Sequence, residues 1–166
     1  MKNISALITC ILCACCLTPT AHADSFGQSV CDATKPALIG ALAITCFSKD
    51  NGPRNAVRAG EGMLIAYGAA HAIQQTCIIN SSSDYAHSFP SKRTAVAFAL
   101  ATSLSDTYPK QKWMAYTGAS LIGWSTVAVN GHTWSDVLAG AALGMAVGKW
   151  TVATPEGILI GRVIKF

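Results

Sequence analysis

Charged residues are scarce in this sequence. They make up 12% of its 166 residues, against 51% for hydrophobic residues. The 12 Lys and Arg side chains are spread along the chain and form no basic stripe interleaved with aromatic residues. Because nucleic-acid binding depends on such a concentrated basic surface, we expect no nucleic-acid partner. The modest net charge of +4 is compatible with a membrane surface or an anionic lipid.

Metal-ligand spacings of cysteine and histidine are missing after residue 23. Four of the seven cysteines lie within the first sixteen residues, and the others are Cys31, Cys46 and Cys77. This spacing does not fit a structural zinc site, so we expect no metal site and no cofactor. In an oxidising compartment the three later cysteines form at most one internal disulfide, and all pairings stay open.

Residues 1–23 have the composition of an export signal. Lys2 gives a positive start, residues 4–17 form an apolar run, and residues 21–23 form a small-x-small cleavage site. We therefore expect a signal peptide over residues 1–23 and one domain over residues 24–166. This places the protein in the periplasm or on the periplasm-facing inner membrane of a bacterium. A lipid on a cysteine of the apolar run is an alternative.

Five later apolar stretches have helical rather than strand periodicity. Met63, Tyr67 and Ala70, for example, recur at helical spacing. Segments rich in Gly, Pro, Asn and Ser separate the stretches. We predict an all-α protein, a single bundle of five to six helices. The stretches cover residues 36–47, 63–79, 94–104, 113–129 and 136–152.

The environment of these helices stays open in the sequence. None of the stretches is a clean run of about 20 apolar residues, the length that crosses a bilayer. Gly140, Gly144 and Gly148 repeat the small-xxx-small spacing that lets helices approach closely in lipid. The same spacing also serves close packing in a soluble bundle. Membrane association is therefore an expectation that the sequence supports only in part.

Residues 88–102, "SFPSKRTAVAFALAT", contain two adjacent cations at the start of an apolar helix. Ser91 is a good N-cap residue, so the segment predicts a loop, a cap and a helix. Free backbone N–H groups and the helix dipole favour an anion such as phosphate at this end. Lys92 and Arg93 either bind such an anion or are simply solvated.

A second candidate segment is "GWSTVAVNGHTWSDVLAGAALG", residues 123–144. Asp136 follows His132 by four residues, which is one helical turn. A carboxylate in that place accepts the imidazole N–H and leaves the other ring nitrogen as a nucleophile or base. The pattern alone is common, and often it only caps a helix.

Together the two segments resemble the type 2 phosphatidic acid phosphatase and haloperoxidase superfamily. Its three motifs are Lys-x6-Arg-Pro, Pro-Ser-Gly-His and Ser-Arg-x5-His-x3-Asp. Ser125, His132 and Asp136 match the third motif in spacing, and "SFPSKRTAVAF" is similar to the segment around the second. The resemblance implies a helical bundle in which His132 attacks phosphorus. It implies that Asp136 orients the imidazole ring of His132. It also implies a phosphate site that includes Ser91 and Ser125.

The chain departs from these motifs where the family binds phosphate. Lys92 and Arg93 stand in place of the Gly and the acid His of the second motif, and Thr126 replaces the Arg of the third. Residues 73–81, where the first motif is expected, contain neither its Lys nor its Arg-Pro. Lys92 and Arg93 are candidates to replace the lost positive charge. His87, in the preceding loop, is a weak candidate for the missing acid.

Two functions follow from the resemblance. The first is a phosphatase that hydrolyses a lipid-linked or other organic phosphate monoester through a phosphohistidine. The second is a catalytically inactive member that serves as an anion-binding or structural membrane-associated protein. A positioned general acid contributes about 10² to 10⁴ in rate, so its loss favours the second function. A vanadate-dependent peroxidase would need the same depleted pocket. For this protein we expect the partner to be a phosphate-bearing lipid or a small organic phosphate.

Overall fold

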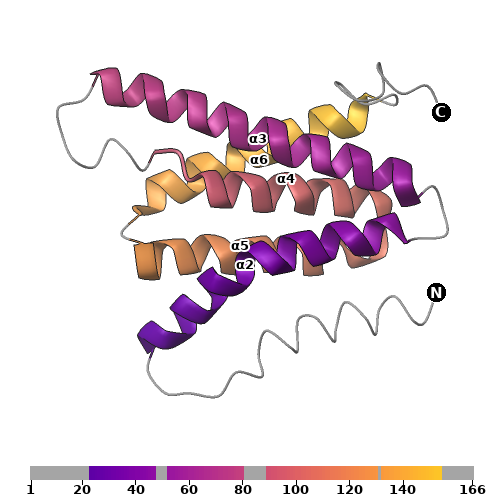
Figure 1. The fold of residues 1–166 in the computed structure, drawn as a ribbon, viewed down its shortest axis with the longest axis horizontal. Helices are drawn as coiled ribbons and strands as arrows, with labels where there is room; N and C mark the ends of the chain where they lie inside the picture. Colours follow the sequence, from indigo (N-terminus) through magenta and orange to yellow (C-terminus); the bar gives the residue numbers. More distant parts are fainter. Residues whose placement is uncertain (1–22, 48–51, 81–88, 131, 155–166) are drawn as a thin grey trace.

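The computed structural model describes residues 23–47, 52–80, 89–130 and 132–154 (Figure 1). In these residues it contains five α-helices, one short 3-10 helix and no strand. The predicted all-α bundle is therefore confirmed. The elements are α2 (Ala23–Cys46), α3 (Gly52–Asn80), α4 (Lys92–Thr107), η2 (Pro109–Gln111), α5 (Lys112–Asn130) and α6 (Trp134–Ala153). The expected signal peptide lies outside the described residues, apart from Ala23.

Each predicted apolar stretch lies within one helix, apart from Phe47, which follows the end of α2, and the first two helices begin earlier than predicted. α2 begins at Ala23 and has Pro36 in its interior, although Pro36 was expected to start the helix. Proline lacks an N–H and is disfavoured inside helices, which is why the sequence suggests a boundary there. α3 begins at Gly52, and Pro53 lies in its first turn. Proline is tolerated in a first turn because its N–H would have no helical partner.

α4 is the central helix of the bundle. It packs against α3, α5 and α6, while α2 packs mainly against α5 and α3 (Figure 1). Small side chains fill these contacts, because alanine lets two helix backbones approach closely. One buried cluster joins α3, α4 and α6, and a second joins α4 and α5. Their buried members are Ala66, Ala70, Ala95, Ala99 and Val147 in the first and Ala97, Ala101 and Ala119 in the second.

The glycines of α6 face the backbone of α4. A Cβ added to Gly140 would lie 2.6 Å from the carbonyl oxygen of Ser91, and one added to Gly148 would lie 2.6 Å from Cβ of Thr102. Gly144 faces the carbonyl oxygen of Ala95 in the same way. The predicted close helix approach is thus confirmed, between α6 and α4. Among the helices in the described ranges, none combines the length and the apolar character needed to cross a membrane.

Candidate active site

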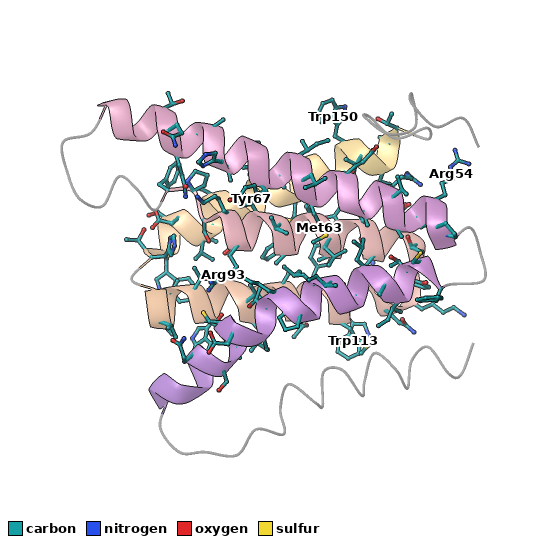
Figure 2. All side chains as sticks on the ribbon, viewed as in Figure 1. Arg54, Met63, Tyr67, Arg93, Trp113 and Trp150 are labelled. Carbon is teal, nitrogen blue, oxygen red and sulfur yellow. The ribbon has the colours of Figure 1, made fainter. Side chains whose placement is uncertain are left out.

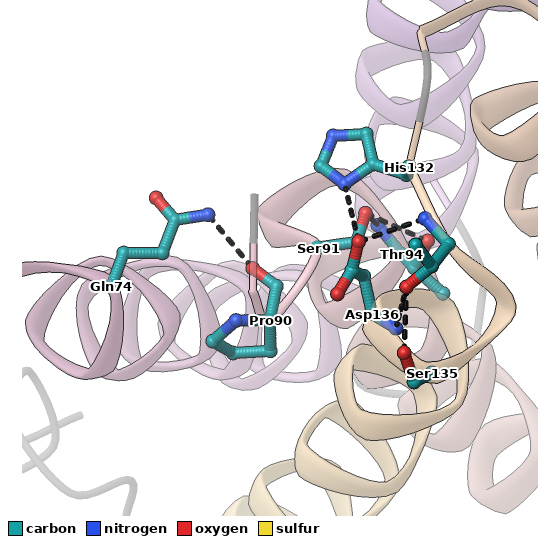
Figure 3. A network of polar contacts seen from close by, with 8 residues as sticks. Gln74, Pro90, Ser91, Thr94, His132, Ser135 and Asp136 are labelled. Atoms are coloured by element: carbon teal, nitrogen blue, oxygen red, sulfur yellow. Dashed lines mark hydrogen bonds and ion pairs between the residues drawn. The ribbon is translucent and has the colours of Figure 1, made fainter. Parts of the chain in front are cut away.

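Two helix N-termini meet at one end of the bundle. Ser91 is the N-cap of α4 and Thr133 is the N-cap of α6. The backbone N–H of Ser91 donates to the carbonyl oxygen of Asp136 at 3.0 Å. The second and third motif segments therefore converge in space, as the resemblance predicts (Figure 3). Gly131, which belongs to the third segment, lies outside the described residues.

Ser91 uses its side chain to cap α4. Its Oγ accepts a hydrogen bond from the backbone N–H of Thr94 at 3.4 Å and lies 3.0 Å from Oγ1 of Thr94. Both residues are fully buried. The predicted N-cap is confirmed. The hydroxyl of Ser91 has these partners already, and its assignment to phosphate binding stays a prediction.

His132 and Asp136 face each other across the start of α6. Nδ1 of His132 lies 3.6 Å from Oδ2 of Asp136, and the two side chains are 20% and 7% exposed. Asp136 is also the third residue of a capping box: Oδ2 accepts the backbone N–H of Thr133 at 2.8 Å. His132 itself precedes the helix, so the capping turn brings its ring toward Asp136 (Figure 3). Asp136 therefore caps the helix and faces the imidazole at once.

This arrangement suits a nucleophilic imidazole. Nδ1 of His132 is buried and has no hydrogen-bond partner among the described residues. A shift of a few tenths of an ångström would bring it within hydrogen-bonding distance of Oδ2 of Asp136. Donation from Nδ1–H then leaves the lone pair on Nε2. The two helix dipoles add positive potential at the same end of the bundle.

The side chains of Lys92 and Arg93 point toward different helices. Nζ of Lys92 lies 5.8 Å from the ring centroid of Tyr67 on α3, a cation–π contact. Nη1 of Arg93 lies 2.9 Å from Sγ of Cys31 on α2. In the view of Figure 2, Tyr67 is labelled above Arg93. Both cations thus have partners within the protein, and their phosphate-binding role stays a prediction.

Ser125 and Thr126 are buried within α5. Each hydroxyl donates to the carbonyl oxygen of Ile122 at 2.8 Å. Sγ of Cys31 lies 3.6 Å from the carbonyl oxygen of Ser125 and 3.7 Å from its Oγ. Arg93 is therefore linked through Cys31 to Ser125. Ser125 directly precedes Thr126, which stands where the family has an arginine. The phosphate-binding role of Ser125 stays a prediction.

The remaining candidate residues are the cysteines and two further histidines, His71 and His87. Cys31 and Cys46 carry free thiols. The side chain of Cys77 and all of His87 lie outside the residues that can be described. His71 is exposed on α3, and its ring stacks against Tyr67 with the centroids 6.3 Å apart. Within the described part of the chain, no three His, Cys, Asp or Glu side chains are grouped as a metal ion would require.

Gln74 makes a contact that no motif predicted. Its Nε2 donates to the carbonyl oxygen of Pro90 at 2.8 Å, and the side chain is buried (Figure 3). Pro90 directly precedes the cap of α4, so Gln74 fixes the chain where it enters the site. The sequence held one signal for this role of Gln74. It is a polar residue at the same helical spacing as Tyr67 and Ala70.

Fold and site together define an all-α bundle with a His–Asp pair beside two helix N-termini, an end of the bundle where the helix dipoles favour an anion. The family model of the PAP2 superfamily matches residues 65–158, more than half of the 166-residue chain. The chain belongs to the PAP2 superfamily, as the resemblance predicted.

One relative is a lipid A 1-phosphatase of Porphyromonas gingivalis (strain ATCC 33277). It is 46% identical over 68 residues, which make up 39% of this chain and 15% of that protein. The match thus covers a minor part of both chains. No solved structure matches this chain.

Proposed function

We propose that this protein is a phosphatase that hydrolyses a phosphate monoester through a phosphohistidine at His132. The observation that carries the proposal is the His132–Asp136 pair, 3.6 Å apart beside two helix N-termini. Membership of the PAP2 superfamily supports a phosphatase-like function. The relative named lipid A 1-phosphatase supports a phosphate-bearing lipid as the substrate, and a small organic phosphate is the alternative.

In the proposed mechanism, Asp136 accepts the N–H of Nδ1 and orients the ring of His132. Nε2 attacks phosphorus, and the bond from phosphorus to the leaving oxygen breaks. The leaving alkoxide takes its proton from solvent. Water then attacks the phosphohistidine, which breaks the P–N bond and releases inorganic phosphate and the free imidazole. The helix dipoles stabilise the negative charge of the phosphoryl group.

The proposed reaction is slow for its class. Arg93 stands where the family has its acid His, and a guanidinium does not release a proton at ordinary pH. With no acid at that place in the motif, the rate is expected to be lower by about 10² to 10⁴. We therefore expect turnover that is measurable with activated esters, whose leaving groups need no protonation, before it is measurable with lipids.

The decisive test compares the full-length protein with His132→Ala. We expect the protein to hydrolyse p-nitrophenyl phosphate and phosphatidic acid, and we expect the variant to lose both activities. His71→Ala is the matched control because His71 is exposed on α3 and stacks on Tyr67, away from His132 in the sequence and in the motifs. Equal turnover by the wild type and His132→Ala would contradict the proposal. A non-catalytic, anion-binding or structural role would then remain.

We also propose that the protein is exported and acts at a membrane surface. On α6, Trp134, Leu138 and Trp150 are 57%, 66% and 56% exposed. Trp134 and Leu138 lie one turn apart on the same face of α6, and an exposed tryptophan suits the interface between lipid and water. Cosedimentation with phosphatidic acid vesicles tests this surface, with alanine at Trp134 and Leu138 as the comparison. Fractionation of bacteria that express the full chain tests export, with the protein expected in the periplasmic or membrane fraction.

A further inference from the structure

One chain of polar contacts joins α4, α2 and α5 through the sulfur of Cys31. Nη1 of Arg93 donates to Sγ of Cys31 at 2.9 Å. The same sulfur lies 3.6 Å from the carbonyl oxygen of Ser125, to which its S–H is a weak donor. Cys31 and Ser125 are buried, whereas Arg93 is half-buried. Two buried residues thus hold a guanidinium whose own side chain is partly open to solvent.

Packing contacts place this chain of residues next to the two helix N-termini of the candidate active site. Gly123 lies two residues before Ser125 on α5. A Cβ added to Gly123 would lie 3.0 Å from Cγ1 of Val137 and 3.6 Å from Cγ2 of Thr94. Thr94 directly follows Arg93, and Val137 directly follows the carboxylate of the His–Asp pair. This part of α5 therefore packs against the first turns of both α4 and α6.

The sulfur orients the guanidinium of Arg93 without neutralising it. Arg93 forms no ion pair with a carboxylate among the described residues, so no described side chain compensates its charge. A thiol is a neutral acceptor and occupies one of the five guanidinium N–H groups, whereas a carboxylate in its place would cancel the charge. The N–H groups that remain keep the planar geometry that suits phosphate. Lys92, by contrast, directs its charge to the ring of Tyr67 on α3.

We propose that Cys31 is a positioning residue of the phosphatase site, and that the guanidinium it holds binds the phosphate group of the substrate. Arg93, and not Lys92, then supplies the charge for which the chain has Thr126 in the third motif. The link supports this assignment, because Cys31 connects Arg93 to the residue directly before Thr126. This inference rests on the proposed phosphatase function. It adds a residue of α2, a helix that carries none of the three motifs.

Calorimetric titration of the full-length protein with orthovanadate, a phosphate analogue, tests the proposal. Cys31→Ala should weaken binding about two- to tenfold, the equivalent of one hydrogen bond. Cys31→Ser should restore most of the affinity, because a hydroxyl also accepts from a guanidinium. Thr34→Ala is the matched control and should bind as the wild type does. Thr34 is also buried on α2, and its hydroxyl donates within that helix, to the carbonyl oxygen of Val30.

A double-mutant cycle tests whether Cys31 acts through Arg93. Arg93→Ala should weaken vanadate binding more than Lys92→Ala does. Adding Cys31→Ala to Arg93→Ala should then weaken it no further. A merely structural role of Cys31 would lower the affinity by the same factor in both backgrounds, and that result overturns the proposal. Wild-type affinity in Cys31→Ala, or a wild-type protein that binds no vanadate, overturns it as well.

Two further comparisons keep the outcome clear. If Cys31→Ala does not fold, the cation variants decide, and a loss of affinity in Lys92→Ala as large as that in Arg93→Ala overturns the proposal. Failure of the phosphatase function is recognised separately, as turnover that His132→Ala retains. Turnover that depends on His132, together with vanadate binding that is indifferent to Cys31, would overturn this inference alone.

Discussion

The backbone N–H of Ser91 donates to the carbonyl oxygen of Asp136 at 3.0 Å, which joins the cap of α4 to the first turn of α6. The two residues come from segments that lie far apart in the sequence. Because this hydrogen bond involves only backbone atoms, it depends on how closely the two helices pack. The geometry of the site is therefore set by the α4–α6 contact as much as by its polar side chains.

Asp136→Asn separates the two roles of the carboxylate. The amide oxygen can still accept the N–H of Thr133, so α6 should keep its cap and the protein its stability. We expect kcat to fall at least about a hundredfold, since removal of the carboxylate beside the histidine of a Ser-His-Asp triad costs about 10⁴. Asp106→Asn, an exposed position on α4, is the control. Wild-type kcat in Asp136→Asn would show that Asp136 is only a cap.

Gly140→Ala should destabilise the protein by about 1 kcal/mol or more, because its new Cβ would lie 2.6 Å from the carbonyl oxygen of Ser91. Gly68→Ala should instead stabilise it by up to about 1 kcal/mol, because an added Cβ there meets nothing within 4 Å and alanine favours the helix. Urea denaturation measures both changes. If the two variants shift the midpoint in the same direction, the α4–α6 contact is looser than described.

Gln74→Leu should destabilise the protein by about 1–3 kcal/mol, because it leaves the buried carbonyl of Pro90 without the Nε2 donor. It should also lower phosphatase turnover, since Pro90 leads directly into Ser91. Gln75→Leu makes the same chemical change at an exposed position next to it and should have little effect. Thermal denaturation and the p-nitrophenyl phosphate assay measure the two consequences. Equal stability of the two variants would remove Gln74 from the support of the site.

Replacing Lys92 with Gly and Arg93 with His restores the second motif of the family. We expect weaker and less salt-sensitive orthovanadate binding, because two cations are lost. Turnover should nevertheless rise about tenfold or more, because an imidazole supplies the missing acid. Lys110→Ala with Lys112→Ala removes two exposed charges near the η2 end of the bundle and is the control. Unchanged vanadate affinity would show that the contacts with Tyr67 and Cys31 are all that Lys92 and Arg93 make.

Much of the fold could be predicted from the sequence, because periodicity and capping are local properties. The core of each helix and the N-cap Ser91 followed from residue types alone. The early start of α2 did not, since Pro36 marks a local boundary that tertiary packing overrides. Convergence of Ser91 with Asp136 followed from the family resemblance and not from spacing, which carries no information about contacts between distant helices.

The partners of the polar side chains could not be predicted from the sequence for the same reason. Lys92 and Arg93 are adjacent in the sequence, yet one lies over Tyr67 of α3 and the other beside Cys31 of α2. Consecutive helical residues point about 100° apart, and which neighbour each one meets depends on the assembled bundle. The contact of Gln74 with Pro90 likewise joins two elements whose relative placement no local pattern specifies.

The capping box has a consequence for how this chain can change in evolution. Oδ2 of Asp136 accepts the N–H of Thr133, so the helix needs a side-chain oxygen acceptor at this residue whether or not a reaction takes place. His132 is different, because its buried Nδ1 has no hydrogen-bond partner among the described residues and contributes little to folding. In a lineage that abandoned turnover, drift would therefore erase His132 long before Asp136. Among descendants of this chain, persistence of the imidazole, rather than of the carboxylate, is the sign of selection for chemistry.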